Sequence, residues 1–265
     1  MTYLLRRFAA VLFATFAFTL PASATTFSTD YTDLWYNPAE SGWGVNVIQQ
    51  GNTIFATLFV YGPDQAPTWY VASNTVGTSA TTFTGPLYRT SGPYFGGVWT
   101  GGGPAIPVGN MTFNFTTPTT ASLTYSVNGV TVTKSVQRQS FVFNNLGGNY
   151  VGGVTGNASG CTLTGIFAYY LLTVTHAASN AISLRVDFFA GNGAAANCTF
   201  NGTYSQNGKL GNVAGNWSCS TSNAGAFTIS EITSSITGWS GRFSGNDQSC
   251  RYTGYFGGTR DVVVP

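Results

Sequence analysis

The sequence predicts an all-β protein made of two consecutive antiparallel meander domains. Apolar and polar residues alternate with a period of two in most segments, as in Ile182–Phe188, and clusters of Gly, Pro and Asn separate these segments. No segment after the first 24 residues combines a helical period with capping residues. We favour small up-and-down β-barrels, because closing a sheet removes its unpaired edges. β-Sandwiches are the alternative, since strand number and spacing fit both architectures.

The turn clusters divide each half of the chain into eight predicted strands. Those of the first half lie near residues 43–49, 53–61, 67–73, 81–88, 93–100, 109–116, 121–127 and 130–139. Those of the second half lie near residues 148–155, 161–175, 181–190, 197–206, 210–219, 224–231, 237–245 and 250–258. Asn128-Gly129 predicts a type I′ hairpin, because both residues accept positive φ, and Asn207-Gly208 offers a second hairpin turn.

The first residues have the features of a bacterial-type secretory leader. Arg6 and Arg7 precede a short apolar stretch, and Pro21-Ala22-Ser23-Ala24 fits a signal-peptidase site. The apolar stretch is shorter than the about 20 residues of a membrane-spanning helix, and no later run is longer. We therefore expect residues 1–24 to be a signal peptide. The mature chain is then exported to the periplasm or beyond, without membrane insertion.

The charge of the chain excludes two classes of partner. The formal net charge is +2, which the two leader arginines account for, so the mature chain is neutral. Binding to nucleic acid or to an anionic membrane requires clustered Lys and Arg, and the sequence has no such cluster. Charged residues make up 7% of the chain against about 25% in an average domain, so uncharged polar residues must form most of the surface.

The four cysteines, Cys161, Cys198, Cys219 and Cys250, all lie in the second half. An even number of cysteines in an exported chain indicates two disulfides. Three pairings are possible, and we favour Cys161 with Cys198 and Cys219 with Cys250. We predict no metal or other cofactor, because the chain has no CxxC pair and His176 is its only histidine.

The change from a cysteine-free to a cysteine-bearing region marks the expected domain boundary. It falls at Asn144–Gly148, a polar and Gly-rich segment. The sequence therefore predicts a first β domain at residues 25–143 and a second, disulfide-bonded β domain at residues 146–263.

One segment of the first half is long and specific. Trp35-Tyr36-Asn37-Pro38-Ala39-Glu40-Ser41-Gly42-Trp43-Gly44 resembles a family of secreted bacterial proteins of unknown function marked by a W-x-N-P-x-E-S-G-W-G segment. The likeness continues through Gln50-Gly51, Ile54–Tyr61, Pro67–Tyr70 and Leu123–Phe141. The second half, with Gly202–Ser205 and Tyr252–Gly258, looks like a module found beside it in similar exported proteins. The resemblance implies export and β structure, and it implies no enzymatic role.

Aromatic and polar residues concentrate around the same segment. Glycan-binding modules stack sugars on exposed aromatic rings while polar neighbours orient the hydroxyl groups. In Trp69-Tyr70 the two rings face opposite sides of a strand, so at least one should point outward. Packing in the core is the alternative role for several of these rings. The candidate ligand-binding residues are Trp35, Tyr36, Asn37, Glu40, Trp69 and Tyr70.

We predict no catalytic residue. His176 ends an apolar strand, and no Gly-x-Ser-x-Gly elbow accompanies it. Glu40 together with Asp33, Asp64 or Asp187 would supply the two carboxylates that a glycosidase needs. However, Glu40 lies in a turn, where a carboxylate more often accepts hydrogen bonds and fixes the loop.

The sequence therefore predicts a non-catalytic exported module that binds a glycan, a surface polymer or a protein partner. A carboxylate-based extracellular hydrolase is the first alternative, and a structural or adhesive surface protein is the second. An exposed aromatic platform or an open barrel mouth would favour the binding module. Paired buried carboxylates in a cleft would favour the hydrolase, and flat polar faces with long exposed edges would favour the structural role.

Overall fold

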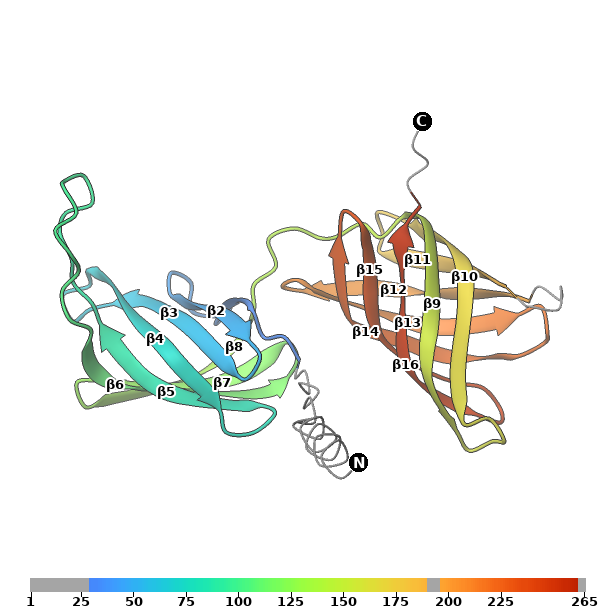
Figure 1. The fold of residues 1–265 in the computed structure, drawn as a ribbon, viewed down its shortest axis with the longest axis horizontal. Helices are drawn as coiled ribbons and strands as arrows, with labels where there is room; N and C mark the ends of the chain where they lie inside the picture. The colour runs from blue at the N-terminus through green and yellow to red at the C-terminus, as the bar shows by residue number, and fades with distance from the viewer. Residues whose placement is uncertain (1–28, 190–195, 262–265) are drawn as a thin grey trace, which may run out of the picture.

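The computed structural model describes residues 29–189 and 196–261. These residues form two consecutive closed barrels, each an antiparallel meander of eight strands (Figure 1). The prediction of two up-and-down β-barrels is confirmed, and the β-sandwich alternative is excluded. The predicted signal peptide, residues 1–24, lies outside the described residues.

Barrel one is closed by its shortest strand. Its strands are β1 Asp33–Tyr36, β2 Gly44–Gln50, β3 Thr53–Tyr61, β4 Pro67–Gly77, β5 Thr82–Arg89, β6 Ile106–Thr117, β7 Thr120–Val127 and β8 Val130–Arg138. Each strand pairs with the next, and β1 pairs with β8 to close the sheet. At this seam Trp35 lies opposite Arg138 and Tyr36 opposite Gln137.

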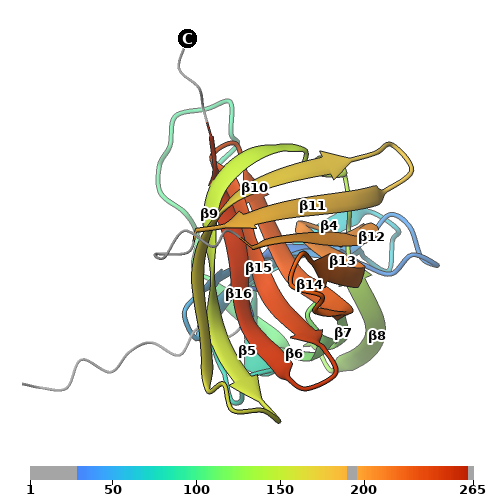
Figure 2. The same ribbon diagram turned by 90° about the vertical axis from the view of Figure 1, so that its right-hand side faces the viewer.

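Barrel two has a much longer closing seam. Its strands are β9 Gly148–Ser159, β10 Gly165–His176, β11 Ala181–Phe188, β12 Asn197–Asn207, β13 Leu210–Cys219, β14 Ala224–Ser235, β15 Gly238–Asn246 and β16 Arg251–Arg260. Strand β16 pairs with β9 from Arg251 opposite Ser159 to Arg260 opposite Tyr150. Figure 2, which looks toward barrel two, shows these strands curving around a common axis.

The alternation in the sequence places the core of each barrel. In β11 the side chains of Ile182, Leu184 and Val186 are buried, while Arg185 between them faces solvent. Two separate clusters of buried apolar side chains result, one inside each barrel. Each barrel therefore has its own hydrophobic core.

The two predicted hairpin turns differ in register. Asn128 and Gly129 have φ values of 50° and 85° between Val127 and Val130, which confirms the type I′ prediction. In the second hairpin Asn207 pairs with Leu210, so the central residues are the next two along the chain. The first of these, Gly208, has a φ of 59°. Lys209 is therefore placed at the tip of the β12–β13 hairpin.

One predicted strand is wrong, and one strand of the structure was not predicted. Residues 93–100 form no strand and belong to the long connection between β5 and β6. This connection, residues 90–105, contains six glycines and two prolines, which disfavour a regular ladder of hydrogen bonds. Strand β1 is missing from the predicted set, because four residues are too few to show an alternation.

The four cysteines form two disulfides, but the favoured pairing is wrong. Cys198 is bonded to Cys219 and Cys161 to Cys250. Cys198 and Cys219 lie directly opposite each other in the β12–β13 hairpin, with their Cα atoms 4.0 Å apart. Cys161 follows β9 and Cys250 precedes β16, so the pairing of these two strands brings their Cα atoms to 5.2 Å. The register of the barrel decides the pairing, and the spacing along the chain does not reveal it.

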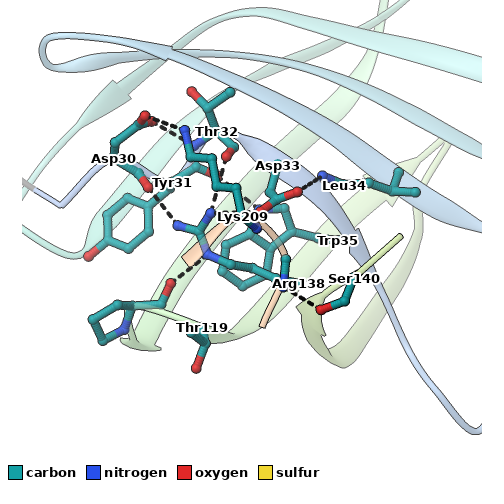
Figure 3. A network of polar contacts seen from close by, with 12 residues as sticks. Asp30, Tyr31, Thr32, Asp33, Leu34, Trp35, Thr119, Arg138, Ser140 and Lys209 are labelled. Carbon is teal, nitrogen blue, oxygen red and sulfur yellow. Dashed lines mark hydrogen bonds and ion pairs between the residues drawn. The ribbon is translucent and has the colours of Figure 1, made fainter. Parts of the chain in front are cut away.

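A buried arginine closes the end of barrel one that faces barrel two (Figure 3). Arg138, the last residue of β8, is only 1% exposed. Its guanidinium lies 5.0 Å from the ring of Trp35. It donates hydrogen bonds to Asp30 O (2.6 Å), Pro118 O (2.7 Å), Asp33 Oδ2 (3.0 Å) and Thr32 O (3.1 Å).

The tip of the β12–β13 hairpin carries the contact from the side of barrel two. Asp33 Oδ2 accepts the backbone N–H of Lys209 at 2.9 Å, in addition to its bond from Arg138. The backbone N–H of Gly208 donates to Ser140 Oγ at 2.8 Å. A Cβ atom on Gly208 would collide with the Asp33 carboxylate, so the close approach requires glycine. We call this set of contacts the joint between the barrels.

The linker, residues 139–147, is bonded to barrel two along its length. Gln206 Nε2 donates to the carbonyl oxygen of Val142 at 2.8 Å. Leu146 is 1% exposed within the core of barrel two, and its N–H donates to His176 Nδ1 at 3.2 Å. Burial lowers the pKa of His176, which favours the neutral ring needed to accept this bond. His176, the only histidine of the chain, therefore fixes the linker to barrel two through this hydrogen bond.

Candidate functional site

Four connections meet at the end of barrel one that is remote from the joint. Because neighbouring strands are antiparallel, every second connection lies at the same end of the barrel. The β5–β6 connection projects farthest from this end (Figure 1). We call the four connections the loop end of barrel one; they are residues 37–43, 62–66, 90–105 and 128–129.

The turn of the W-x-N-P-x-E-S-G-W-G segment is held by its own polar side chains. Asn37 Oδ1 accepts the N–H of Ala39 at 3.0 Å, and the carbonyl of Asn37 accepts the N–H of Glu40 at 3.0 Å. Glu40 Oε2 accepts the indole N–H of Trp43 at 3.0 Å. Lys134 of β8 donates to Glu40 Oε1 at 2.9 Å. Glu40 therefore closes the turn through Trp43 and ties it to the barrel through Lys134.

These bonds also set the charge of Glu40. The hydrogen bond from Lys134 lowers the pKa of Glu40, and the bond from Trp43 adds to the effect. A general acid in glycoside hydrolysis needs the opposite shift, toward a protonated carboxyl at neutral pH. The environment of Glu40 therefore suits a structural carboxylate.

The other acidic residues considered from the sequence are engaged elsewhere. Asp33 lies in the joint, at the opposite end of barrel one from Glu40. Asp64 Oδ1 accepts the N–H of Ala66 at 3.1 Å within its own turn. Asp187 belongs to barrel two and pairs with Arg185 at 3.3 Å. The structure thus gives Asp33 and Asp187 no place beside Glu40, and each of the three aspartates has a local structural partner.

Two glycines of the segment are covered by aromatic rings of β3. A Cβ atom on Gly42 would lie 2.9 Å from the Tyr61 hydroxyl oxygen, and a Cβ atom on Gly44 would lie 2.7 Å from the Phe59 ring. Gly42 also has a φ of 104°, a conformation that side chains disfavour. The glycines let the turn pass beneath Phe59 and Tyr61, so the segment fixes the position of these two rings.

The predicted ligand-binding residues divide into four groups. Trp35 is 0% exposed and donates its indole N–H to Tyr31 O at 3.0 Å, so it belongs to the core and has no face free for a ligand. Tyr36 and Asn37 are half-buried at the loop end, and Tyr70 is packed against the core. Glu40 is engaged as described above. Trp69 is 52% exposed, which confirms that one ring of Trp69-Tyr70 points outward.

Sequence reasoning missed the most exposed rings of the loop end. Tyr61 is 57% exposed on β3, and the β5–β6 connection carries further exposed apolar side chains. These are Tyr94 (72%), Trp99 (71%), Val98 (85%) and Phe95 (93%). The signal available in the sequence was the density of glycine around them, since residues flanked by glycines have few neighbours that could bury them. The prediction of a strand at residues 93–100 did not take this glycine density into account.

Within residues 29–189 and 196–261, no group of three or more His, Cys, Asp or Glu side chains is arranged to hold a metal ion. The same ranges contain no helix with the length and apolar character needed to cross a membrane. No protein-family model matches the chain, and no curated protein matches it in sequence.

Proposed function

We propose that this chain is an exported, non-catalytic binding module that recognises a neutral glycan at the loop end of barrel one. The observation that carries the proposal is the set of exposed aromatic rings held on a rigid sheet at this end. The two disulfides support an oxidising, extracytoplasmic location.

The rings of β3 and β4 form a platform that suits a sugar. Trp69 lies opposite Phe59, and Tyr61 lies opposite Pro67, all on the outward face of neighbouring strands. Because Phe59 and Tyr61 rest on Gly42 and Gly44, little side-chain entropy is lost when a ligand stacks on them. Flat aromatic faces pack against the C–H faces of pyranose rings.

The electrostatics of the loop end favour an uncharged ligand. Glu40 and Lys134 form an ion pair with an N–O distance of 2.8 Å, so their charges offset each other. Thr, Ser and Asn dominate the polar surface of the chain and offer hydroxyl and amide groups to sugar hydroxyls. A neutral polysaccharide is therefore a better match than an acidic one.

A protein partner is the second candidate, and a different observation favours it. Phe95 and Val98 project from the β5–β6 connection with 93% and 85% of their surface exposed. Phe95 packs only against Tyr94 among the aromatic rings of the connection, at 4.7 Å between centroids. Apolar side chains that are exposed and project in this way are typical anchors of protein interfaces.

The test is a screen on an array of neutral polysaccharides, followed by affinity measurements on two variants. Trp69→Ala and Tyr61→Ala each remove one ring of the platform. We expect each variant to weaken glycan binding at least about tenfold, because loss of a central aromatic contact costs more than about 1.4 kcal/mol. Tyr169→Ala is the matched control, since Tyr169 is 62% exposed on barrel two.

Two outcomes would contradict the glycan proposal. One is the absence of binding to any polysaccharide on the array. The other is a bound polysaccharide whose affinity is unchanged in both platform variants while circular dichroism shows that they are folded. If residues 92–102 are replaced by a short Gly-Ser turn and a protein partner is lost, the second candidate takes its place.

A further inference from the structure

The far end of barrel two contains an open cavity that the proposed function does not use. Its volume is about 400 Å³, within the range of about 300 to 1,000 Å³ that is usual for small-molecule sites. It lies at the end opposite the joint, where the disulfide between Cys198 and Cys219 links the start of β12 to the end of β13. Small eight-stranded barrels have an interior wide enough to hold one small ligand.

Aromatic rings from both sides of the barrel form the wall of this cavity. Phe200 and Trp217 stack with their ring centroids 5.9 Å apart, and Phe243 lies 5.9 Å from Phe256. Tyr170, which is buried, packs against Phe256 at 5.0 Å and donates to Gly153 O at 2.7 Å. The wall is thus supported from within and keeps its shape.

The cavity is uncharged. None of the described side chains that line it is acidic or basic, and its polar rim consists of Thr221 and Asn223. Tyr252 donates its hydroxyl hydrogen to Asp247 at 2.8 Å. Burial and the Asp247 carboxylate raise the pKa of Tyr252 to about 12, so this wall residue stays neutral. A charged ligand would lose its hydration here without gaining a partner.

The wall also contains an unused hydrogen-bond donor. Trp217 is 8% exposed, and its indole N–H has no hydrogen-bond partner among the described residues. Trp239 shares this property but does not line the cavity. The Trp217 nitrogen is covered by its neighbours, so a ligand would reach it only as the indole shifts. An unpaired buried donor favours a ligand that carries one acceptor over a pure hydrocarbon.

We propose that the open end of barrel two binds a small, neutral, mainly apolar molecule that carries one hydrogen-bond acceptor. The apolar part fills the cavity against the contacting rings of Phe200 and Phe256, and the acceptor bonds to Trp217. Binding at this site is independent of the glycan platform on barrel one. The two sites lie on different barrels and share no residue.

The test uses the full chain and the neutral fluorophore N-phenyl-1-naphthylamine, whose emission rises in an apolar site. We expect saturable binding that 1-decanol competes away, whereas decanoate at pH 8 competes at least tenfold less well. In Ala168→Phe the added ring fills the cavity, so fluorophore affinity should fall at least tenfold. Ala214→Phe is the matched control, because Ala214 is exposed on β13 and outside the cavity, and its affinity should stay within twofold.

Further variants keep the result decisive. If Ala168→Phe does not fold, Thr221→Phe blocks the exposed rim without touching the core and should also lower the affinity. Trp217→Phe keeps a ring and removes the donor, so it should weaken 1-decanol more than the fluorophore. Wild-type affinity in a folded Ala168→Phe or Thr221→Phe would place the fluorophore elsewhere and overturn the proposal. Equal competition by decanoate and 1-decanol would overturn the neutrality of the ligand.

Discussion

Arg138 shows how a single buried charge can be accommodated at the end of a barrel. Moving an ion out of water costs several kcal/mol unless hydrogen bonds and an opposite charge replace the lost hydration. Burial lowers the pKa of Arg138, and the bond to Asp33 opposes that shift. Three carbonyl oxygens and the Asp33 carboxylate accept all the hydrogen bonds described for the guanidinium. Arg138 therefore stays charged and fastens the segment before β1 to the end of β8.

We expect Arg138→Met to destabilise barrel one strongly. The substitution leaves Asp33 without its cation and three partly buried carbonyl groups without this donor, a loss of about 3 to 5 kcal/mol. Arg185→Met is the matched control, because the Arg185 side chain is 63% exposed and its pair with Asp187 should contribute no more than about 1 kcal/mol. The measurement is the free energy of unfolding in urea, followed by tryptophan fluorescence. Equal losses in the two variants would show that the buried pair adds nothing to stability.

Two tryptophans of barrel one differ in exposure, and this difference limited what the sequence could predict about the site. Trp35 and Trp69 both flank polar turn residues, yet one is 0% and the other 52% exposed. The direction of Trp69 follows from alternation within β4, which the sequence displays. The direction of Trp35 depends on its pairing with Arg138 across the closing seam, a contact of high sequence separation. Local patterns do not contain that information.

At the scale of elements, the sequence predicted the strands of barrel two more completely than those of barrel one. All eight strands of barrel two lie at predicted positions, because each is long enough to show alternation and ends at a turn cluster. In barrel one the exposed β5–β6 connection imitates a strand, since aromatic residues favour strands by propensity. Propensity alone does not supply a partner strand, and residues 93–100 have none.

The two disulfides connect strands that are already neighbours at the open end of barrel two. Cys198–Cys219 spans 21 residues of one hairpin, whereas Cys161–Cys250 spans 89 residues and fastens the seam that closes the barrel. In the chain-entropy account a disulfide stabilises more when it closes a longer loop of the unfolded chain. The second bond should therefore contribute more to stability than the first.

Replacing each pair by alanine tests this order. We expect Cys161→Ala with Cys250→Ala to destabilise barrel two by about 1 kcal/mol more than Cys198→Ala with Cys219→Ala. The free energy of unfolding of each double variant in urea gives the comparison. Non-reducing peptide mapping of the wild type provides the control, and recovery of a peptide that joins Cys161 to Cys198 would contradict the connectivity.

At the scale of the whole molecule, two separate cores are joined by a small set of polar contacts. Domains within one chain move relative to each other unless their interface is large or specifically fixed. Here the β12–β13 hairpin of barrel two reaches Asp33 and Ser140 of barrel one and its linker (Figure 3). Lys209 also pairs through its ammonium group with Asp30. The tip of one hairpin therefore controls the relative orientation of the barrels.

We expect Gly208→Ala to release the barrels from each other while leaving both folded. The new methyl group would collide with Asp33 and would lie 2.7 Å from Arg138 Cβ, so the hairpin tip must withdraw from barrel one. Gly129→Ala is the matched control. Gly129 also has a positive φ, so alanine costs about 1 to 2 kcal/mol of backbone strain at this position too. However, a Cβ atom on Gly129 would meet no atom within 4 Å. Small-angle X-ray scattering measures the outcome, since freer barrels give a larger radius of gyration and a broader distribution of interatomic distances. Circular dichroism of both variants shows whether each barrel remains folded. If Gly208→Ala scatters as the wild type and Gly129→Ala do, the linker contacts of Gln206 and Leu146 hold the barrels together without the hairpin.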